Sequence, residues 1–125
     1  MMKNFFLIAV VFMVFTACNN DSDDHVLPLN TVEGKWLWSP TENRADANTM
    51  YEFVNGTRYK YYATSNVDWN ALDSSDRIPG AAIYTFDENT LTIDETAKVV
   101  TFECDGGIMH FPNAAKFWRL SANCN

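Results

Sequence analysis

Basic residues are scarce in this 125-residue chain. It has 9 lysines and arginines against 16 aspartates and glutamates, which gives a formal net charge of -7. No stretch gathers the basic side chains into a cluster that would attract a phosphate backbone. We therefore expect no nucleic-acid partner.

Histidines and catalytic motifs are equally few. The two histidines, His25 and His110, are not paired for metal binding, and the sequence contains no HExxH, GxSxG, P-loop or GxGxxG motif. A thiol nucleophile would need Cys104 to be free, exposed and next to His110. We expect a protein that is not an enzyme and that has no metal or cofactor, with chemistry at Cys104 and His110 as the catalytic alternative.

The one long apolar run lies near the start of the chain, at residues 5–15. It follows Lys3 and is separated from Cys18 by two small residues. A membrane-spanning helix needs about 20 apolar residues, more than this run provides. A basic start, a short apolar segment and a small-residue end are the parts of a signal peptide, so we expect residues 1–17 to be removed.

Phe15-Thr16-Ala17-Cys18 resembles the lipobox of bacterial lipoproteins. That resemblance implies cleavage before Cys18, acylation of its sulfur and of the new amine, and a lipid anchor in place of a membrane span; an ordinary secretory signal is the alternative. The acidic residues 19–25 resemble the export tag of surface-exposed lipoproteins in some Gram-negative bacteria, and otherwise form a solvated tether. We expect an outer-membrane lipoprotein of the bacterial cell envelope, with residues 18–30 as acylated cysteine and acidic tether.

The other two cysteines are Cys104 and Cys124. A bacterial envelope is oxidising enough for them to pair, and a bridge would stabilise the fold by about 3 kcal/mol in the chain-entropy model. If residues 108–111 and 116–122 form a hairpin, the end of the chain returns to the turn that follows Cys104. A disulfide and two separate thiols both fit the sequence.

Residues 31–125 have the length of one domain and a pattern of short strands and turns. Asn55-Gly56 is a strong type I' hairpin signal, because both turn positions need a positive φ. Short strands with turns every 8 to 12 residues or so indicate an antiparallel sandwich or barrel. The expected strands are residues 36–38, 51–54, 58–64, 82–86, 90–93, 99–104, 108–111 and 117–120.

Residues 66–80 form a long, acidic loop that interrupts this pattern, with a helical turn expected near Trp69. Long loops in compact domains often cover or form a binding site, while a plain connection is the alternative. Trp69 is either a cap over the barrel mouth or a stacking platform for a ligand. Asp68, Asp73 and Asp76 support a calcium site by their spacing alone, and we expect none.

Gly34-Lys35-Trp36 at the first strand, with the late Phe117-Trp118-Arg119-Leu120, resembles the lipocalin and wider calycin pattern. More closely, VEGKW, YEF, YTFDENTLTID and FWRL resemble the short lipocalin-like domains of bacterial envelope lipoproteins, over nearly all of residues 31–122. The resemblance implies an all-β fold, a small antiparallel up-and-down β-barrel. It also implies that Trp36 plugs the closed end and that Arg119 covers it in a cation–π contact.

So small a barrel has an interior filled largely by side chains. We expect a membrane-anchored lipoprotein that binds a small apolar or amphipathic ligand; the alternative is a non-catalytic interaction module that binds an envelope protein or a glycan. An enclosed apolar cavity would favour the first and an exposed apolar patch the second. The candidate ligand-binding residues are Trp38, Phe53, Tyr61, Trp69, Tyr84 and Phe86.

Overall fold

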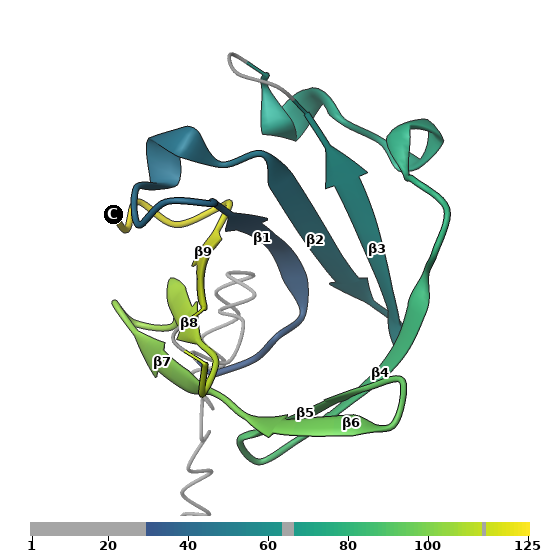
Figure 1. Cartoon of the computed structure of the whole chain (residues 1–125), viewed down its shortest axis with the longest axis vertical. Coiled ribbons are helices and arrows are strands. Elements are labelled where there is room, and N and C mark those ends of the chain that lie inside the picture. Colours follow the sequence, from purple (N-terminus) through teal and green to yellow (C-terminus); the bar gives the residue numbers. More distant parts are fainter. Residues whose placement is uncertain (1–29, 64–66, 114) are drawn as a thin grey trace, which may run out of the picture.

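A computed structural model describes residues 30–63, 67–113 and 115–125. Within them, nine strands form one antiparallel sheet that curls into a nearly closed barrel, which fits a calycin-like fold (Figure 1). The expected all-β barrel is confirmed; the expected signal peptide, Cys18 and all but the last residue of the tether lie outside the described residues. The strands are β1 (Gly34–Trp38), β2 (Thr49–Val54), β3 (Thr57–Tyr62), β4 (Ala82–Asp87), β5 (Thr90–Ile93), β6 (Thr96–Val99), β7 (Thr101–Glu103), β8 (Ile108–His110) and β9 (Lys116–Arg119).

The helical content of the described ranges is three 3₁₀ turns. They are η1 (Arg44–Asp46), η2 (Trp69–Ala71) and η3 (Ser74–Asp76). Trp69 therefore begins a helical turn, as expected. No helix in the described part of the chain is long and apolar enough to cross a membrane.

The sheet follows the order of the chain and closes on itself through its first and last strands. β1 pairs with β2 on one side and with β9 on the other. The two ends of the sheet, β6 and β7, are consecutive in the chain and are separated only by Val100, which is buried in the core. β6 and β7 therefore behave as one bent strand, and the topology is the expected up-and-down meander.

Turn chemistry decides where the strands end. Between β2 and β3, Asn55 has a φ of 50° and Gly56 a φ of 82°, which confirms the predicted type I' hairpin. Asp94 and Glu95 also have positive φ angles, 45° and 72°, between β5 and β6. β6 is absent from the predicted strands because Asp-Glu lacks the asparagine or glycine that usually marks such a turn.

Alternation along the strands sends one set of side chains into the barrel. They form the main core, which fills much of the interior around Trp36. Burying each large apolar side chain contributes roughly 1.5–3 kcal/mol. The buried members are Val32, Trp36, Phe53, Tyr84, Leu91, Val100, Met109 and Phe117.

The segment after β3 covers the outer face of the sheet. Trp69 and Leu72 pack there against a second buried cluster of Leu37, Met50 and Tyr61. Tyr61 pairs with Met50 in the register of β2 and β3, on the face opposite to the barrel interior. The candidate ligand-binding residue Tyr61 therefore lies on the outer face of the sheet.

The C-terminal segment is fastened to the outside of β8 and β9. A disulfide joins Cys104 to Cys124, with their Cα atoms 6.3 Å apart. Arg44 Nη1 donates hydrogen bonds to the carbonyl oxygens of Ala122 at 2.6 Å and Cys124 at 2.8 Å. These contacts hold the chain end over Trp118, which is fully buried.

Candidate functional site

One end of the barrel is closed by Trp36 and Arg119. Trp36 is completely buried, and its Nε1–H donates to the carbonyl oxygen of Val32 at 2.9 Å. The Cζ atom of Arg119 lies 4.2 Å from the centroid of the Trp36 ring. The structure thus brings together the two residues expected to plug and cover this end.

The guanidinium of Arg119 serves as a structural clamp, since each of its three nitrogens donates to a backbone carbonyl oxygen. It donates from Nη1 to the carbonyl oxygen of Glu33 at 2.7 Å, from Nη2 to that of Thr31 at 2.6 Å, and from Nε to that of Gly106 at 3.1 Å. Burial lowers the pKa of Arg119 from its ordinary value. Gly34 makes this clamp fit, since its φ is +117° and a Cβ there would stand 3.0 Å from Arg119 Nη1.

Tyr84 and Phe53 belong to the same filled end. Their rings meet edge to face with centroids 4.9 Å apart. The Tyr84 hydroxyl donates to the carboxylate of Glu33. Burial raises the pKa of Tyr84, and the contact with the Glu33 carboxylate raises it further. Phe86 packs edge to face on Phe102 at 6.2 Å in the same core. These three candidates are core residues, and their ligand-binding role stays a prediction.

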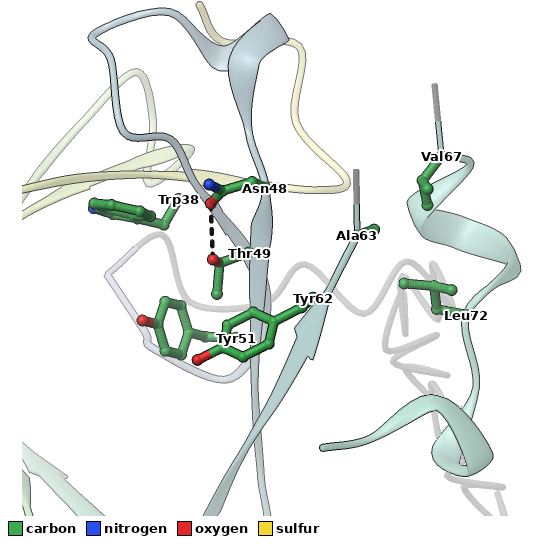
Figure 2. Close-up of a pocket in the computed structure, with 8 residues that line it drawn as sticks. All are labelled: Trp38, Asn48, Thr49, Tyr51, Tyr62, Ala63, Val67 and Leu72. Carbon is green, nitrogen blue, oxygen red and sulfur yellow. Dashed lines mark hydrogen bonds between the residues drawn. The ribbon is translucent and has the colours of Figure 1, made fainter. Parts of the chain in front are cut away.

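The opposite end of the barrel is an open pocket of about 880 Å³. Figure 2 shows the rings of Tyr51 and Tyr62 next to each other and Trp38 close by, with Val67 and Leu72 standing beyond Ala63. The volume falls in the range typical of small-molecule sites. The pocket is lined by Trp38, Asn48, Thr49, Tyr51, Tyr62, Ala63, Val67 and Leu72.

This pocket exists because three neighbouring strands stop at one level. Trp38 ends β1, Thr49 begins β2 and Tyr62 ends β3, and the register places Thr49 opposite both of the others. Tyr62 is left 61% exposed. Of the candidate ligand-binding residues, Trp38 is the one that the structure places in the pocket. Thr49, Tyr51 and Tyr62 were not among those candidates, because nothing in the sequence shows where neighbouring strands end at the same level.

A smaller chamber lies deeper in the barrel and shares Tyr51 with the pocket. It measures about 70 Å³. The Cζ atom of Arg58 is 5.3 Å from the centroid of the Tyr51 ring. Burial raises the pKa of Tyr51; Arg58 opposes this shift and Tyr62 adds to it, so the pKa remains raised. The chamber is lined by Tyr51, Phe53, Arg58, Ile93, Phe111 and Phe117.

Tyr61 has a structural role on the outer face. Its hydroxyl donates to Glu52 Oε1 at 2.6 Å and accepts from Arg77 Nε at 3.1 Å, while Arg77 Nη2 lies 2.9 Å from Glu52 Oε1. Burial raises the pKa of Glu52, but the hydrogen bonds from Tyr61 and Arg77 outweigh it and leave that pKa lowered. Arg77 also stacks on Tyr59, 3.6 Å from the ring centroid. The cluster fixes the loop that carries Trp69 to the outer face, away from the barrel mouth.

The loop aspartates serve as caps for the 3₁₀ turns. Asp68 Oδ1 accepts from the backbone N–H of Asn70 at 3.0 Å, and Asp73 Oδ1 from that of Ser75 at 2.8 Å. Asp76 Oδ2 accepts from the backbone N–H of Asp73 at 3.0 Å. In the described ranges, no group of three or more His, Cys, Asp or Glu side chains is placed to hold a metal ion.

Of the two residues of the catalytic alternative, Cys104 is covalently bonded. Cys104 is in the disulfide with Cys124, so this structure offers no Cys104 thiol as nucleophile. His110 Nε2 lies 3.2 Å from Glu103 Oε2 on the outer face.

Over the ranges that the structure describes, the large apolar side chains exposed outside the pocket are dispersed. Ile83 is 71% exposed and Val99 59% exposed, both on the outer face of the β4–β6 region. Val99 pairs with Thr90, which pairs with Asp87, at the far end of β4 from Ile83. At about 3.3 Å of rise per residue, the two are well separated along the sheet and form no single patch.

Comparison with known proteins gives no family to which the chain can be assigned. No protein-family model, no curated protein and no solved structure matches it.

Proposed function

We propose that this chain is a bacterial outer-membrane lipoprotein whose lipocalin-like barrel binds one small apolar or amphipathic ligand at its open end. The observation that carries the proposal is the open pocket of about 880 Å³, whose walls include the rings of Trp38, Tyr51 and Tyr62. The anchor rests on the lipobox-like sequence that ends at Cys18.

The lining of the pocket favours an apolar ligand body. Tyrosine and tryptophan rings present large apolar faces together with a polar atom, which suits a site that is partly wet. Tyr62 keeps 61% of its surface exposed, and a ligand lying on it would remove apolar surface from water. Because the opposite end is filled around Trp36, the ligand lies in the mouth of the barrel and not at its centre. The pocket is open, in contrast to the enclosed apolar cavity expected for a ligand-binding lipoprotein.

An interaction module is the weaker candidate. Its expected mark was an exposed apolar patch, and Ile83 and Val99 are exposed but lie apart on the sheet. If the folded protein binds no apolar probe, the interaction module becomes the better supported candidate.

Binding is tested with N-phenyl-1-naphthylamine, a neutral apolar fluorophore, on a chain of residues 19–125. That chain keeps all the described strands, the three core clusters and the disulfide. We expect saturable binding of one probe per chain, with quenching of tryptophan fluorescence. A protein that is folded by near-ultraviolet circular dichroism yet binds no probe would contradict the proposal.

Two matched variants locate the site. Ala63→Trp fills the pocket, and Ala97→Trp makes the same change at an exposed position on the outer face of β6. We expect about a tenfold loss of affinity in the first and none in the second. Equal affinities in both variants would place the probe elsewhere.

The anchor is tested separately on the full chain in a Gram-negative host fed with labelled palmitate. We expect label in the wild-type protein of the outer-membrane fraction and none after Cys18→Ala. Label that persists in Cys18→Ala, or a wild-type protein released without label, would contradict lipidation at Cys18.

A further inference from the structure

We propose that the ligand carries a negative charge that enters the inner chamber and binds Arg58. This inference rests on the proposed function and deepens it by naming the ligand class: an apolar body with one carboxylate, sulfonate or phosphate group. It follows from the charge, the hydrogen bonding and the connection of the two cavities.

The interior of the barrel is positive although the chain as a whole carries a charge of -7. In the strand register, Arg58 is level with Phe53 and Lys60 with Tyr51, both inner residues, and Lys98 is level with the inner Leu91. The acidic residues of the strands take the other face. They are Glu52, level with Lys35; Asp87, next to the inner Phe86; and Glu103, level with Ile108 of the outer cluster.

Arg58 is an inner cation with a buried hydrogen-bond donor that is not used. Its Nε atom is buried and has no hydrogen-bond partner among the residues that the structure describes. A buried donor without an acceptor destabilises a fold, and an acceptor supplied by a ligand removes that cost. Arg119, the other inner arginine, already donates to three carbonyl oxygens. Of the two inner arginines, Arg58 is therefore the one with a buried N–H group available to an anion.

The chamber beside Arg58 has room for a charged group but not for a whole ligand. Its volume is about 70 Å³, whereas a cavity that holds one water molecule needs about 10–15 Å³ in the same measure. A second cation lies near one of its lining rings, since Lys98 Nζ is 5.7 Å from the centroid of the Phe111 ring. The chamber is thus small, positive and walled by aromatic rings.

Tyr51 connects the chamber to the pocket, because its side chain lines both. A ligand whose apolar body lies against Trp38 and Tyr62 has Tyr51 between that body and Arg58. The arrangement fixes the orientation of the ligand: charged group inward, apolar body in the mouth. Charge-assisted hydrogen bonds to a guanidinium are strong and directional, which makes Arg58 the residue that selects anionic ligands.

The test compares two probes that differ by one charged group. 8-Anilino-1-naphthalenesulfonate is N-phenyl-1-naphthylamine with a sulfonate added. Both are titrated into residues 19–125 and into the variants Arg58→Met, Arg58→Lys and Lys35→Met. Lys35→Met is the matched control, because Lys35 is level with the outward Glu52 and lies outside the barrel.

We expect Arg58→Met to weaken binding of the sulfonate probe about tenfold or more and to change binding of the neutral probe less than about twofold. Arg58→Lys should keep part of the preference, and Lys35→Met should keep all of it. If Arg58→Met weakens both probes equally, or neither, the anion proposal fails while the proposed function stands. If neither probe binds the folded wild-type protein, both fail.

Discussion

The interior of the barrel holds two pairs of an arginine and an aromatic ring, and the two arginines have different roles. At the closed end Arg119 lies 4.2 Å from the centroid of the Trp36 ring, and in the inner chamber below the open pocket Arg58 lies 5.3 Å from that of Tyr51. Arg119 gives its N–H groups to three backbone carbonyls, whereas the buried Nε of Arg58 has no partner in the described residues. An arginine over an aromatic ring is therefore structural where its hydrogen bonds are satisfied and is available to a ligand where they are not.

The largest expected difference in the free energy of unfolding is between alanine variants of the two tryptophans of β1. Trp36→Ala should lower the free energy of unfolding by about 3–5 kcal/mol, because it leaves a cavity in the filled end. Trp38→Ala should lower it by roughly 1–2 kcal/mol, because Trp38 is only half buried. Urea unfolding of the two variants measures both values. Equal losses would remove the distinction between a plugged end and an open one.

The two arginines give the next largest difference. Arg119→Met leaves the carbonyl oxygens of Thr31, Glu33 and Gly106 without their donor, so we expect a loss of about 2–4 kcal/mol in the free energy of unfolding. Arg58→Met removes an unsatisfied buried donor and should change stability by less than about 0.5 kcal/mol. Urea unfolding measures both changes in stability. A large loss of unfolding free energy in Arg58→Met would mean that Arg58 has a structural role.

Alanine substitution at two glycines measures how closely Arg119 packs on the backbone at Gly34. Gly34 and Gly80 both have positive φ, +117° and +104°, but a Cβ at Gly34 would meet Arg119 at 3.0 Å while one at Gly80 would meet nothing within 4 Å. Alanine at either position introduces backbone strain, and alanine at Gly34 adds crowding of the clamp. We expect Gly34→Ala to be less stable than Gly80→Ala by about 1 kcal/mol in thermal or urea unfolding. No difference would show that Arg119 has room to move.

The smallest expected effect on stability comes from the titration of Tyr84 at alkaline pH. The pKa of Tyr84 is raised in the folded chain by burial and by Glu33, above the value of 10.0 of an unperturbed tyrosine. A raised pKa means that this contribution to stability is full below about pH 10 and is lost as the pH rises toward the folded-state value. Stability measured against pH should fall less steeply above pH 10 in Tyr84→Phe than in the wild type. Parallel curves would show that Tyr84 titrates normally.

The closed end could be largely predicted from the sequence. The Gly-x-Trp pattern at Gly34 and the late Arg119 indicated it, and Asn55-Gly56 fixed one hairpin because few residues adopt two positive φ angles. The hairpin depends on local chemistry, because it is carried by two neighbouring residues with their own conformational preferences. The pairing of Trp36 with Arg119 was an implication of the resemblance to the lipocalin pattern, since the two residues are far apart in the sequence.

The open end could not be predicted, for a physical reason that β3 makes plain. Its alternation of Arg58 and Lys60 with Tyr59 and Tyr61 predicts a strand with its charges in water. Here the loop from Val67 onward buries the tyrosines on the outer face, so the basic residues turn inward. Alternation shows that two faces differ, but tertiary packing decides which one is inside.

The most direct test of the account is a two-dimensional ¹H–¹⁵N spectrum of the protein titrated with N-phenyl-1-naphthylamine. We predict shifts of the Trp38 indole signal and of the Thr49 and Tyr51 amides, while the Trp36 indole, bonded to the Val32 carbonyl, does not move. Shifts of the Trp36 indole as large as those of Trp38, or shifts confined to the outer face of the sheet, would contradict a barrel with one sealed end and one binding end.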